Sequence, residues 1–394
     1  MATIKSDQLN SVNTITNDVL RTKENEQLSR KCVTIKIDKL LEINKESQII
    51  LNIQDIISNI VKSISEGKLP SIVIRNQRLW NNCNINNNKL ELKHLDEAVS
   101  LEIKYDHKLS KEFTHIIYLL GRIYKLLMTK SISTKRELYY ENNSLFEDQS
   151  QVDTVADKVC CLLGVARWEV GLCATSKGLV AGNLFMTTPS GDTVDCSSPD
   201  GVSVPQFISS GIHLQSDARF VLVVEKDAAF QKLLEEGFLI HHGPCIMVTG
   251  KGYPDLCTRL LVKFIWEQLK LPIYALVDAD VYGVDIMCVY RFGSLKQSHI
   301  GERLAVPALK WLGVHPSDIT ELNINSAPLS DSDKRRCQHL MSRPYFSEDS
   351  VIRKELKILL EIGRKSEIED VAKITNGYLT DVYIPMKLSS EQLI

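Results

Sequence analysis

The feature that most constrains the fold is a series of strand-length apolar runs in the second half of the chain, separated by helical patterns. Between the second and third runs, the apolar residues of PDLCTRLLVKFIWEQL fall on one face of a helix. Continuous apolar strands that alternate with helices are typical of a parallel α/β sheet buried on both faces. The four runs are RFVLVVEKD, PCIMVTGKG, PIYALVDAD and RLAVPALKW.

Acidic residues follow two of these runs. Glu225 comes directly after FVLVV, and Asp278 and Asp280 come directly after PIYALV. In open α/β sheets the functional residues lie at the carboxyl ends of the strands, so the three side chains are expected to lie together. A single acid at a strand end is commonly a helix cap or an ion-pair partner, but three unneutralised acids repel one another and raise a pKa. Mg²⁺ prefers oxygen ligands, so the sequence predicts a Mg²⁺ site formed by these residues.

The first half of the chain has a different pattern. Helices are predicted over residues 35–64, 113–130 and 152–165, and the asparagine-rich residues 75–93 are predicted to form a loop or hairpin. Residues 167–186 have the pattern of short strands with a glycine-bearing turn. Helices followed by a small hairpin indicate a winged-helix module, and the charged residues after 328 are expected to be helical, ending in a strand at YLTDVYIP.

A tyrosine doublet, Tyr139 and Tyr140, stands in the first half, where Ser133 or Thr134 could cap a new helix. Arg136 precedes Tyr140 by four residues, so the two side chains share a helix face and could meet one phosphate. Residues 121–140 carry five basic residues against one acid. A charge run of this kind, taken alone, is most often a solvated helix face. The basic residues are Arg122, Lys125, Lys130, Lys135 and Arg136.

Composition excludes several classes of protein. No run of eighteen uncharged apolar residues is present, so no membrane association is expected, and the N-terminus lacks the apolar core of a signal peptide, which favours an intracellular protein. The ten cysteines include no CxxC pair and no zinc spacing, so they are expected to be reduced and mainly buried. GPCIMVTGKG lacks the P-loop spacing, and neither HExxH nor GxSxG occurs.

The strand-Glu and strand-Asp-x-Asp pattern resembles a Toprim domain, and further motifs extend the resemblance. From about residue 110 onwards the chain resembles the meiotic double-strand-break proteins, eukaryotic relatives of the A subunit of archaeal topoisomerase VI. The first hundred residues match only loosely. Val281 stands where relatives often have a proline, which changes no ligand. The motifs are TKRELYY, TSKGLVAGN, FVLVVEKDAAFQKLL, CIMVTGKGYPDLCTRLLVK, ALVDADVYGVDIM and VPALKWLGVHPSDI.

This resemblance implies an α/β multidomain protein in which a helical winged-helix (CAP-like) domain precedes a Toprim domain with a parallel sheet. The expected segments are a flexible arm at residues 1–35, a winged-helix domain carrying the nucleophile at 36–206, and a Toprim domain with C-terminal helices at 207–394. The family's nucleophile falls on Tyr140, and its packing aromatic falls on Tyr139. Its metal ligands fall on Glu225, Asp278 and Asp280.

The expected reaction is DNA transesterification, in which Tyr140 attacks a backbone phosphorus and leaves a 3′-hydroxyl and a 5′-phosphotyrosyl link. Arg136 and Mg²⁺ would offset the charge of the transition state. Lys177 and Lys251 are candidates for contacts with double-stranded DNA, although each could be an exposed turn lysine. Tyr253 could stack on DNA or pack within the protein.

Family geometry further implies a homodimer whose subunits share active sites, an ATPase partner like the topoisomerase VI B subunit, meiotic accessory proteins, and a nuclear, chromosome-associated location. Two alternatives remain open at this point. One is a Toprim nuclease that uses water, and the other is a non-catalytic scaffold, against which the intact acids argue.

Overall fold

The computed structural model describes residues 45–106, 110–173, 176–188, 191–206, 208, 211–390 and 393. The predicted arm, residues 1–35, lies outside the described residues. Residues up to 68 and residues 69–394 form two units. In the first unit residues 45–65 are helical, in agreement with the predicted helix, whose first ten residues are not described. None of the described helices combines the length and apolar character needed to cross a membrane.

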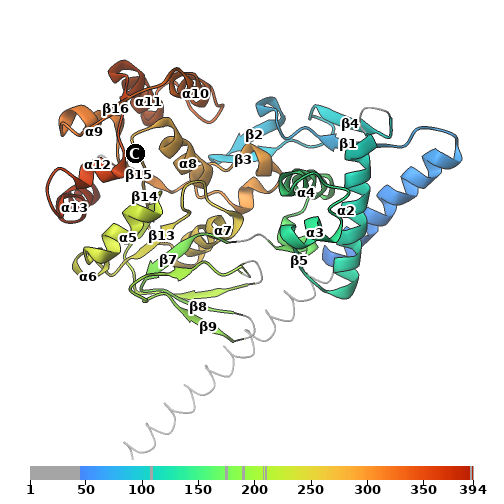
Figure 1. Ribbon diagram of the computed structural model, residues 1–394, viewed down its shortest axis with the longest axis horizontal. Coiled ribbons are helices and arrows are strands. Elements are labelled where there is room, and N and C mark those ends of the chain that lie inside the picture. The colour runs from blue at the N-terminus through green and yellow to red at the C-terminus, as the bar shows by residue number, and fades with distance from the viewer. Residues whose placement is uncertain are drawn as a thin grey trace, which may run out of the picture. The chain divides into compact units, whose positions relative to one another are not determined.

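The second unit begins with small β-elements and three helices (Figure 1). The asparagine-rich stretch forms the predicted hairpin, in which β2 pairs with β3 in antiparallel register. Leu90 of β3 is fully buried, and its N–H donates to the carbonyl of Phe292, so the hairpin is held against the α/β part of the chain. The elements are β1 (Ser71–Arg75), β2 (Cys83–Asn86), β3 (Lys89–Leu92), β4 (Ser100–Lys104), α2 (Ser110–Thr129), β5 (Ser133–Thr134), α3 (Lys135–Glu141), α4 (Gln149–Leu163), the 3₁₀ helix η2 (Arg167–Val170) and β6 (Leu172–Cys173).

A six-stranded sheet forms the centre of the α/β part, in the order β10-β7-β13-β12-β14-β15. The four strands from β13 to β15 are parallel, as predicted, whereas β7 and β10 add an antiparallel edge. The strands are β7 (Leu179–Gly182), β10 (Val202–Ser203), β12 (Val221–Val224), β13 (Ile246–Thr249), β14 (Ile273–Leu276) and β15 (Lys310–Gly313).

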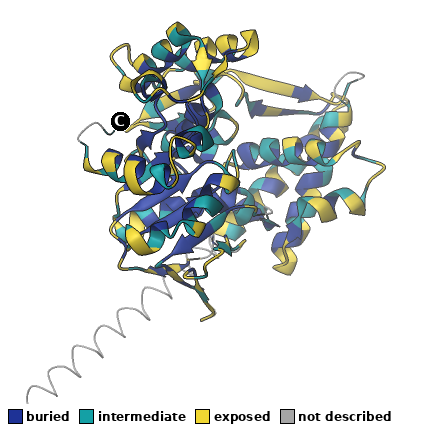
Figure 2. Ribbon diagram, turned by 60° about the vertical axis from the view of Figure 1, so that its left-hand side comes forward, coloured by how far each residue is buried: buried dark blue, intermediate teal, exposed yellow. Residues whose placement is uncertain are grey.

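Both faces of this sheet are buried, which explains the continuous apolar runs (Figure 2). In β12, Val221 and Val223 belong to one hydrophobic core, while Leu222 and Val224 belong to the other. The first core is covered by α7 (Leu256–Phe264), continued by the π-helical turn η4 (Ile265–Leu269), and by α8 (Val281–Arg291), α10 (Asp331–Met341) and α11 (Val351–Ile362). The second is covered by α5 (Asp227–Glu235), α6 (Phe238–His241), α9 (Pro316–Glu321), α12 (Ile368–Ala372), η6 (Tyr378–Tyr383) and α13 (Ile384–Ser389).

Smaller elements complete the α/β part. A three-stranded sheet in the order β11-β8-β9 lies outside the main sheet. Its strands are β8 (Phe185–Thr187), β9 (Thr193–Asp195) and β11 (His213–Gln215), and the remaining elements are η5 (Leu295–Arg303), β16 (Ala327–Pro328) and β17 (Arg364–Lys365).

Two expectations about strands are wrong. The fourth apolar run contributes only Lys310 and Trp311 to β15, because Pro307 lacks an N–H for strand pairing and Val306 to Leu309 form a turn. YLTDVYIP is helical rather than extended. Its buried residues Leu379 and Tyr383 are four apart, a spacing that places them on one helix face in the second core.

The expected winged-helix hairpin also takes another form. Strand β6 pairs with β5 in parallel, and β7 joins the six-stranded sheet. The winged-helix assignment and the segment boundaries at 35/36 and 206/207 stay predictions. The strands of the main sheet begin with β7, before residue 207.

Eight of the nine described cysteines are buried. The prediction of mainly buried cysteines is therefore confirmed for these nine, and their reduced state stays a prediction.

Candidate active site

Two of the three predicted acids meet at the carboxyl ends of neighbouring strands. Strands β12 and β14 are parallel, with Val224 opposite Leu276, so Glu225 and Asp278 emerge at the same edge of the sheet. The Asp278 N–H donates to Glu225 Oε2 at 2.9 Å, and the two residues are only 7% and 4% exposed. Strand register therefore brings together two acids that are far apart in the sequence.

Asp280 stands at the N-terminus of α8. Its Oδ1 accepts hydrogen bonds from the N–H groups of Tyr282, at 2.8 Å, and Gly283, at 2.7 Å. This is an ordinary helix cap, the bland role that a single acid at a strand end can take. No described residue donates a hydrogen bond to Asp280 Oδ2 or Glu225 Oε1, which leaves one oxygen on each side chain for another ligand.

The electrostatics of this edge disfavour three bare carboxylates. Burial, followed by the charge of Asp278, raises the pKa of Glu225 to about 8. Burial also raises the pKa of Asp278 to about 6 and that of Asp280 above its ordinary value. The donor set consists of oxygens alone, which is the chemistry that Mg²⁺ prefers, and a divalent cation would relieve the repulsion. The residues fit such an ion in their chemistry.

The three acids are not placed as a finished metal site. Within the described residues, no group of three or more His, Cys, Asp or Glu side chains is arranged so that it could hold a metal ion. Asp278 is paired within the protein: Lys226 places its Nζ 2.9 Å from Asp278 Oδ2, and the N–H of Ile368 donates to Asp278 Oδ1 at 2.9 Å. Both oxygens of this acid already have a donor.

The tyrosine doublet lies on α3, whose start is determined locally. Thr134 Oγ1 accepts from the Glu137 N–H at 3.2 Å, and Glu137 Oε2 accepts from the Thr134 N–H at 2.8 Å. This reciprocal pair is a capping box, so the prediction of a cap at Ser133 or Thr134 is confirmed for Thr134. Leu138 is buried and orients the helix.

The two tyrosines differ in exposure. Tyr140 is 64% exposed, whereas Tyr139 is half-buried, and their rings meet edge to face with centroids 5.4 Å apart. Arg136 is exposed one turn before Tyr140. The exposed helix surface thus presents a phenol and a guanidinium.

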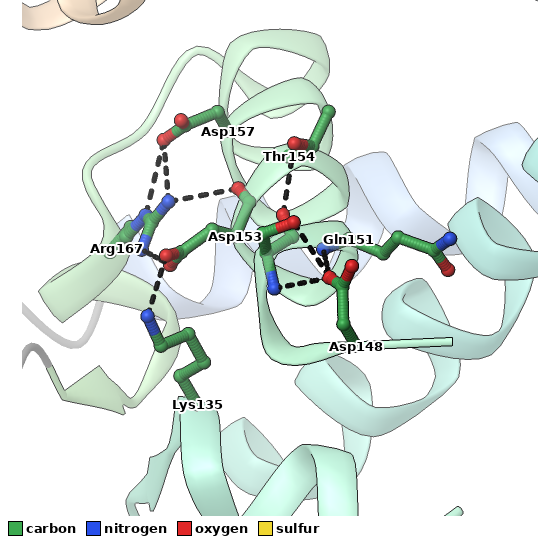
Figure 3. A network of polar contacts seen from close by, with 8 residues as sticks. Lys135, Asp148, Gln151, Asp153, Thr154, Asp157 and Arg167 are labelled. Carbon is green, nitrogen blue, oxygen red and sulfur yellow. Dashed lines mark hydrogen bonds and ion pairs between the residues drawn. The ribbon is translucent and has the colours of Figure 1, made fainter. Parts of the chain in front are cut away.

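Ion pairs hold α3 at both ends. Lys135 Nζ lies 2.7 Å from Asp153 Oδ2 on α4, and Arg167 shares that carboxylate with a contact of 2.8 Å to Oδ1 (Figure 3). At the other end, Glu141 Oε1 accepts from Arg122 of α2 at 2.6 Å. Two of the five basic residues noted in the sequence are therefore structural. Lys125, Lys130 and Arg136 remain exposed.

The predicted DNA contacts Lys177 and Lys251 are brought together. Lys177 Nζ donates to the carbonyl of Lys251 at 3.2 Å, and both residues reach the surface. The Gly252 N–H next to them donates to the carbonyl of Glu225 at 2.8 Å, so this loop adjoins the acids. Lys251 Nζ itself pairs with Asp227 at 2.8 Å.

Tyr253 is held by a polar network around the buried Asp285. Its hydroxyl donates to Asp285 Oδ2 at 2.7 Å and accepts from Arg336 at 2.8 Å. The sequence left two roles for Tyr253, stacking on DNA or packing within the protein. Because the hydroxyl is bonded within the protein, these contacts favour the packing role. The residue is 40% exposed.

The structure does not join all the predicted site residues. Among the described residues, no hydrogen bond or ion pair links Tyr140 or Arg136 to the three carboxylates. Sequence reasoning also missed Lys226 and its partners Glu367 and Glu369. The lysine directly follows Glu225, which was a visible signal, but nothing local indicated that the two glutamates lie near it.

Comparison with known proteins supports the resemblance to the topoisomerase VI A-subunit family that the motifs indicated. The Toprim-domain model of the topoisomerase 6 A-subunit/Spo11 family matches residues 220–388, and the family model "Type IIB DNA topoisomerase" matches residues 111–172. The meiotic recombination protein SPO11 of Mus musculus is 39% identical over 351 residues, which is 88% of this chain and 88% of the relative. The chain belongs to the family of the topoisomerase VI A subunit and Spo11.

Further relatives lie in both branches of this family. The human meiotic recombination protein SPO11 is 38% identical over 347 residues, 87% of each chain. The A subunit of DNA topoisomerase 6 from Arabidopsis thaliana is 37% identical over 278 residues, 69% of this chain and 65% of the relative. Family membership and the Toprim domain, both expected from the motifs, are thus confirmed. The segment matched by the Toprim model contains Glu225, Asp278 and Asp280.

Proposed function

We propose that this chain makes meiotic DNA double-strand breaks by a topoisomerase-like transesterification and so initiates homologous recombination. The observation that carries the proposal is that an exposed tyrosine on a helix held at both ends, Tyr140, occurs in the same chain as the carboxylate set of the Toprim domain. Membership of a family whose members include meiotic recombination proteins supports the meiotic role. A nuclear, chromosome-associated location follows from that role.

Tyr140 would be the nucleophile. Its oxygen forms a bond to a backbone phosphorus, the bond from that phosphorus to the 3′-oxygen breaks, and the proton lost by the phenol is balanced by one gained at the 3′-oxygen. The products are a 5′-phosphotyrosyl link and a 3′-hydroxyl. Arg136, exposed one turn away, would hold the non-bridging phosphate oxygens and offset the developing charge.

Glu225, Asp278 and Asp280 would hold Mg²⁺, which supplies charge neutralisation at the phosphate when bound. The oxygen-only donor set and its raised pKa values support this assignment. Lys177 and Lys251, on adjoining loops beside Glu225, would bind the DNA backbone of the same strand.

Two copies of the chain would act together. Among the described residues, no hydrogen bond or ion pair joins Tyr140 or Arg136 to the carboxylates of the same chain, so each site would be completed by a second copy. The lack of a P-loop in the sequence supports an ATPase partner like the topoisomerase VI B subunit, with meiotic accessory proteins.

The test is a comparison of Tyr140→Phe and Tyr139→Phe in a cleavage reaction that contains the ATPase partner. Tyr140→Phe is expected to eliminate the covalent DNA–protein product, and Tyr139→Phe to retain it, because only the first hydroxyl reacts. Mass spectrometry of the trapped adduct identifies the residue. Cleavage that survives in Tyr140→Phe without an adduct would favour the water-using nuclease instead, and wild-type protein without any cleavage would favour the scaffold.

The metal site has a separate test. Asp278→Asn keeps the shape of the side chain and removes its charge, so we expect Mg²⁺ binding and cleavage to be lost together, with the fold preserved. Isothermal titration with Mg²⁺ measures the binding. An unchanged Mg²⁺ affinity would remove Asp278 from the ligand set.

A further inference from the structure

Lys226 forms an ion pair with one of the proposed metal ligands, Asp278. It directly follows Glu225, at the junction of β12 and α5, and its side chain is 27% exposed. Its Nζ lies 2.9 Å from Asp278 Oδ2, 2.9 Å from Glu367 Oε2 and 3.2 Å from Glu369 Oε2. A single ammonium group therefore bridges the predicted metal site and two acids that the proposed mechanism does not use.

The contact with Asp278 puts the lysine in competition with a divalent cation. Mg²⁺ binds carboxylate oxygens at about 2.0–2.1 Å and demands near-ideal geometry, so an ammonium group paired with the same oxygen competes with it. The Ile368 N–H already occupies the other oxygen of Asp278. A like charge within about 4–6 Å also weakens the binding of a second cation.

Glu367 and Glu369 give the lysine another place to go. They flank the start of α12, and their segment is tied to the acids because the Ala279 N–H donates to the carbonyl of Ser366 at 2.9 Å. With these two carboxylates within reach, the ammonium group can release Asp278 and remain paired. The side chain of Glu367 is 63% exposed and that of Glu369 is 27% exposed, so they have room to follow it.

We propose that Lys226 is a positioning residue that competes with the divalent cation for Asp278 and is drawn onto Glu367 and Glu369 when the metal binds. Without metal, the lysine neutralises Asp278 and keeps the carboxylates in place. With metal, it becomes the counter-ion of the C-terminal segment. This inference rests on the proposed metal site and assigns to that site an internal control of metal affinity.

The first test measures Mg²⁺ affinity of the full chain by isothermal titration at about pH 8.5, where exposed acids are ionised. Lys226→Met keeps the aliphatic stem and removes the charge, so we expect Mg²⁺ to bind about tenfold more tightly or better. Lys232→Met is the matched control, because this lysine lies on the same helix and pairs with Glu236 at 2.7 Å. It should leave Mg²⁺ affinity unchanged.

The second test changes affinity in the opposite direction. Glu367→Gln combined with Glu369→Gln removes the alternative partners, so the lysine stays on Asp278 and Mg²⁺ binds about tenfold more weakly or worse. This double variant leaves both Lys226 and the proposed ligands intact. It therefore tests the idea even if the lysine variant folds poorly.

The outcomes separate this inference from the proposed function. Mg²⁺ binding that Asp278→Asn abolishes but Lys226→Met does not tighten overturns the role of the lysine alone. Absence of Mg²⁺ binding in wild type, Lys226→Met and Lys232→Met overturns the metal site and the inference together. Unchanged Mg²⁺ affinity with weaker DNA binding in chelator makes Lys226 a phosphate contact instead.

Discussion

Arg167 gives a sharp test of how the tyrosine helix is held. Its guanidinium donates to Asp157 Oδ1 at 2.7 and 3.2 Å, to Asp153 Oδ1 at 2.8 Å, and to the Asp153 carbonyl at 2.9 Å (Figure 3). The Arg167 side chain is 16% exposed and that of Asp157 is 18% exposed. Substitution Arg167→Met keeps the apolar bulk but leaves the partly buried Asp157 without its ion-pair partner, whereas Asp153 retains Lys135.

The expected loss is about 3–5 kcal/mol in the free energy of unfolding at pH 8, the cost of removing one partner from a buried pair. We expect the lower end, because both side chains keep some exposure to water and Lys296 still lies close enough to lower the pKa of Asp157. Burial already raises the pKa of Asp157, and loss of the arginine raises it further. The folded variant then takes up a proton at a higher pH than the unfolded chain, so its deficit shrinks as the pH falls from 8 towards 5.

Chemical denaturation followed by circular dichroism measures the effect. Lys111→Met is the control, since this lysine pairs with Glu147 at 3.5 Å with both side chains mostly exposed, and it should cost at most about 1 kcal/mol. Asp157→Asn added to Arg167→Met should recover much of the loss, because the uncompensated charge is gone. A loss no greater than that of Lys111→Met, or one independent of pH, would refute the reasoning.

Three further predictions concern other parts of the α/β unit. Tyr253→Phe removes the hydroxyl bonded to Asp285 and should lower the free energy of unfolding by about 1–3 kcal/mol, as measured by chemical denaturation. DNA affinity should persist if the ring alone contacts DNA. Gly178→Ala places a methyl group against Thr258 Oγ1 and should lower the free energy of unfolding by about 1–3 kcal/mol. It should also weaken DNA binding in a mobility-shift assay, because the adjoining loop that carries Lys177 must move. Burial and a neighbouring lysine lower the pKa of His315 to about 4, so this side chain stays neutral in the folded protein. Below the ordinary histidine pKa of 6.5, the unfolded chain therefore binds more protons than the folded protein. Stability should fall by up to about 1.4 kcal/mol per pH unit from about pH 6.5 to 4, and His315→Asn should flatten that slope.

Local features of the fold were predictable because they depend on neighbouring residues. The capping box at Thr134 and Glu137 needs only residues three apart, and the helix that it starts was predicted from the sequence. The continuous apolar strands likewise indicated a sheet buried on both faces, and therefore the edge where Glu225 and Asp278 meet.

The wrong expectations share a physical cause. Short apolar runs do not distinguish a strand from a buried helix, and YLTDVYIP is helical because Leu379 and Tyr383 pack on one face into the second core. Likewise, nothing in the LVAG run showed that β7 would pair with β13 in the main sheet, since strand partners are chosen by contacts between distant residues.

The sequence by itself determined the chemistry available to this protein: an oxygen-only set of strand-end acids, a tyrosine doublet with an arginine one turn earlier, and family motifs that place them. Only the tertiary structure decided which charges remain available. Lys135 and Arg122 are neutralised by Asp153 and Glu141, while Lys226 joins Asp278 to glutamates from the end of the chain. The reason is that ion pairing acts over a few ångströms in space, and strand register and helix docking bring together charges that the sequence keeps apart.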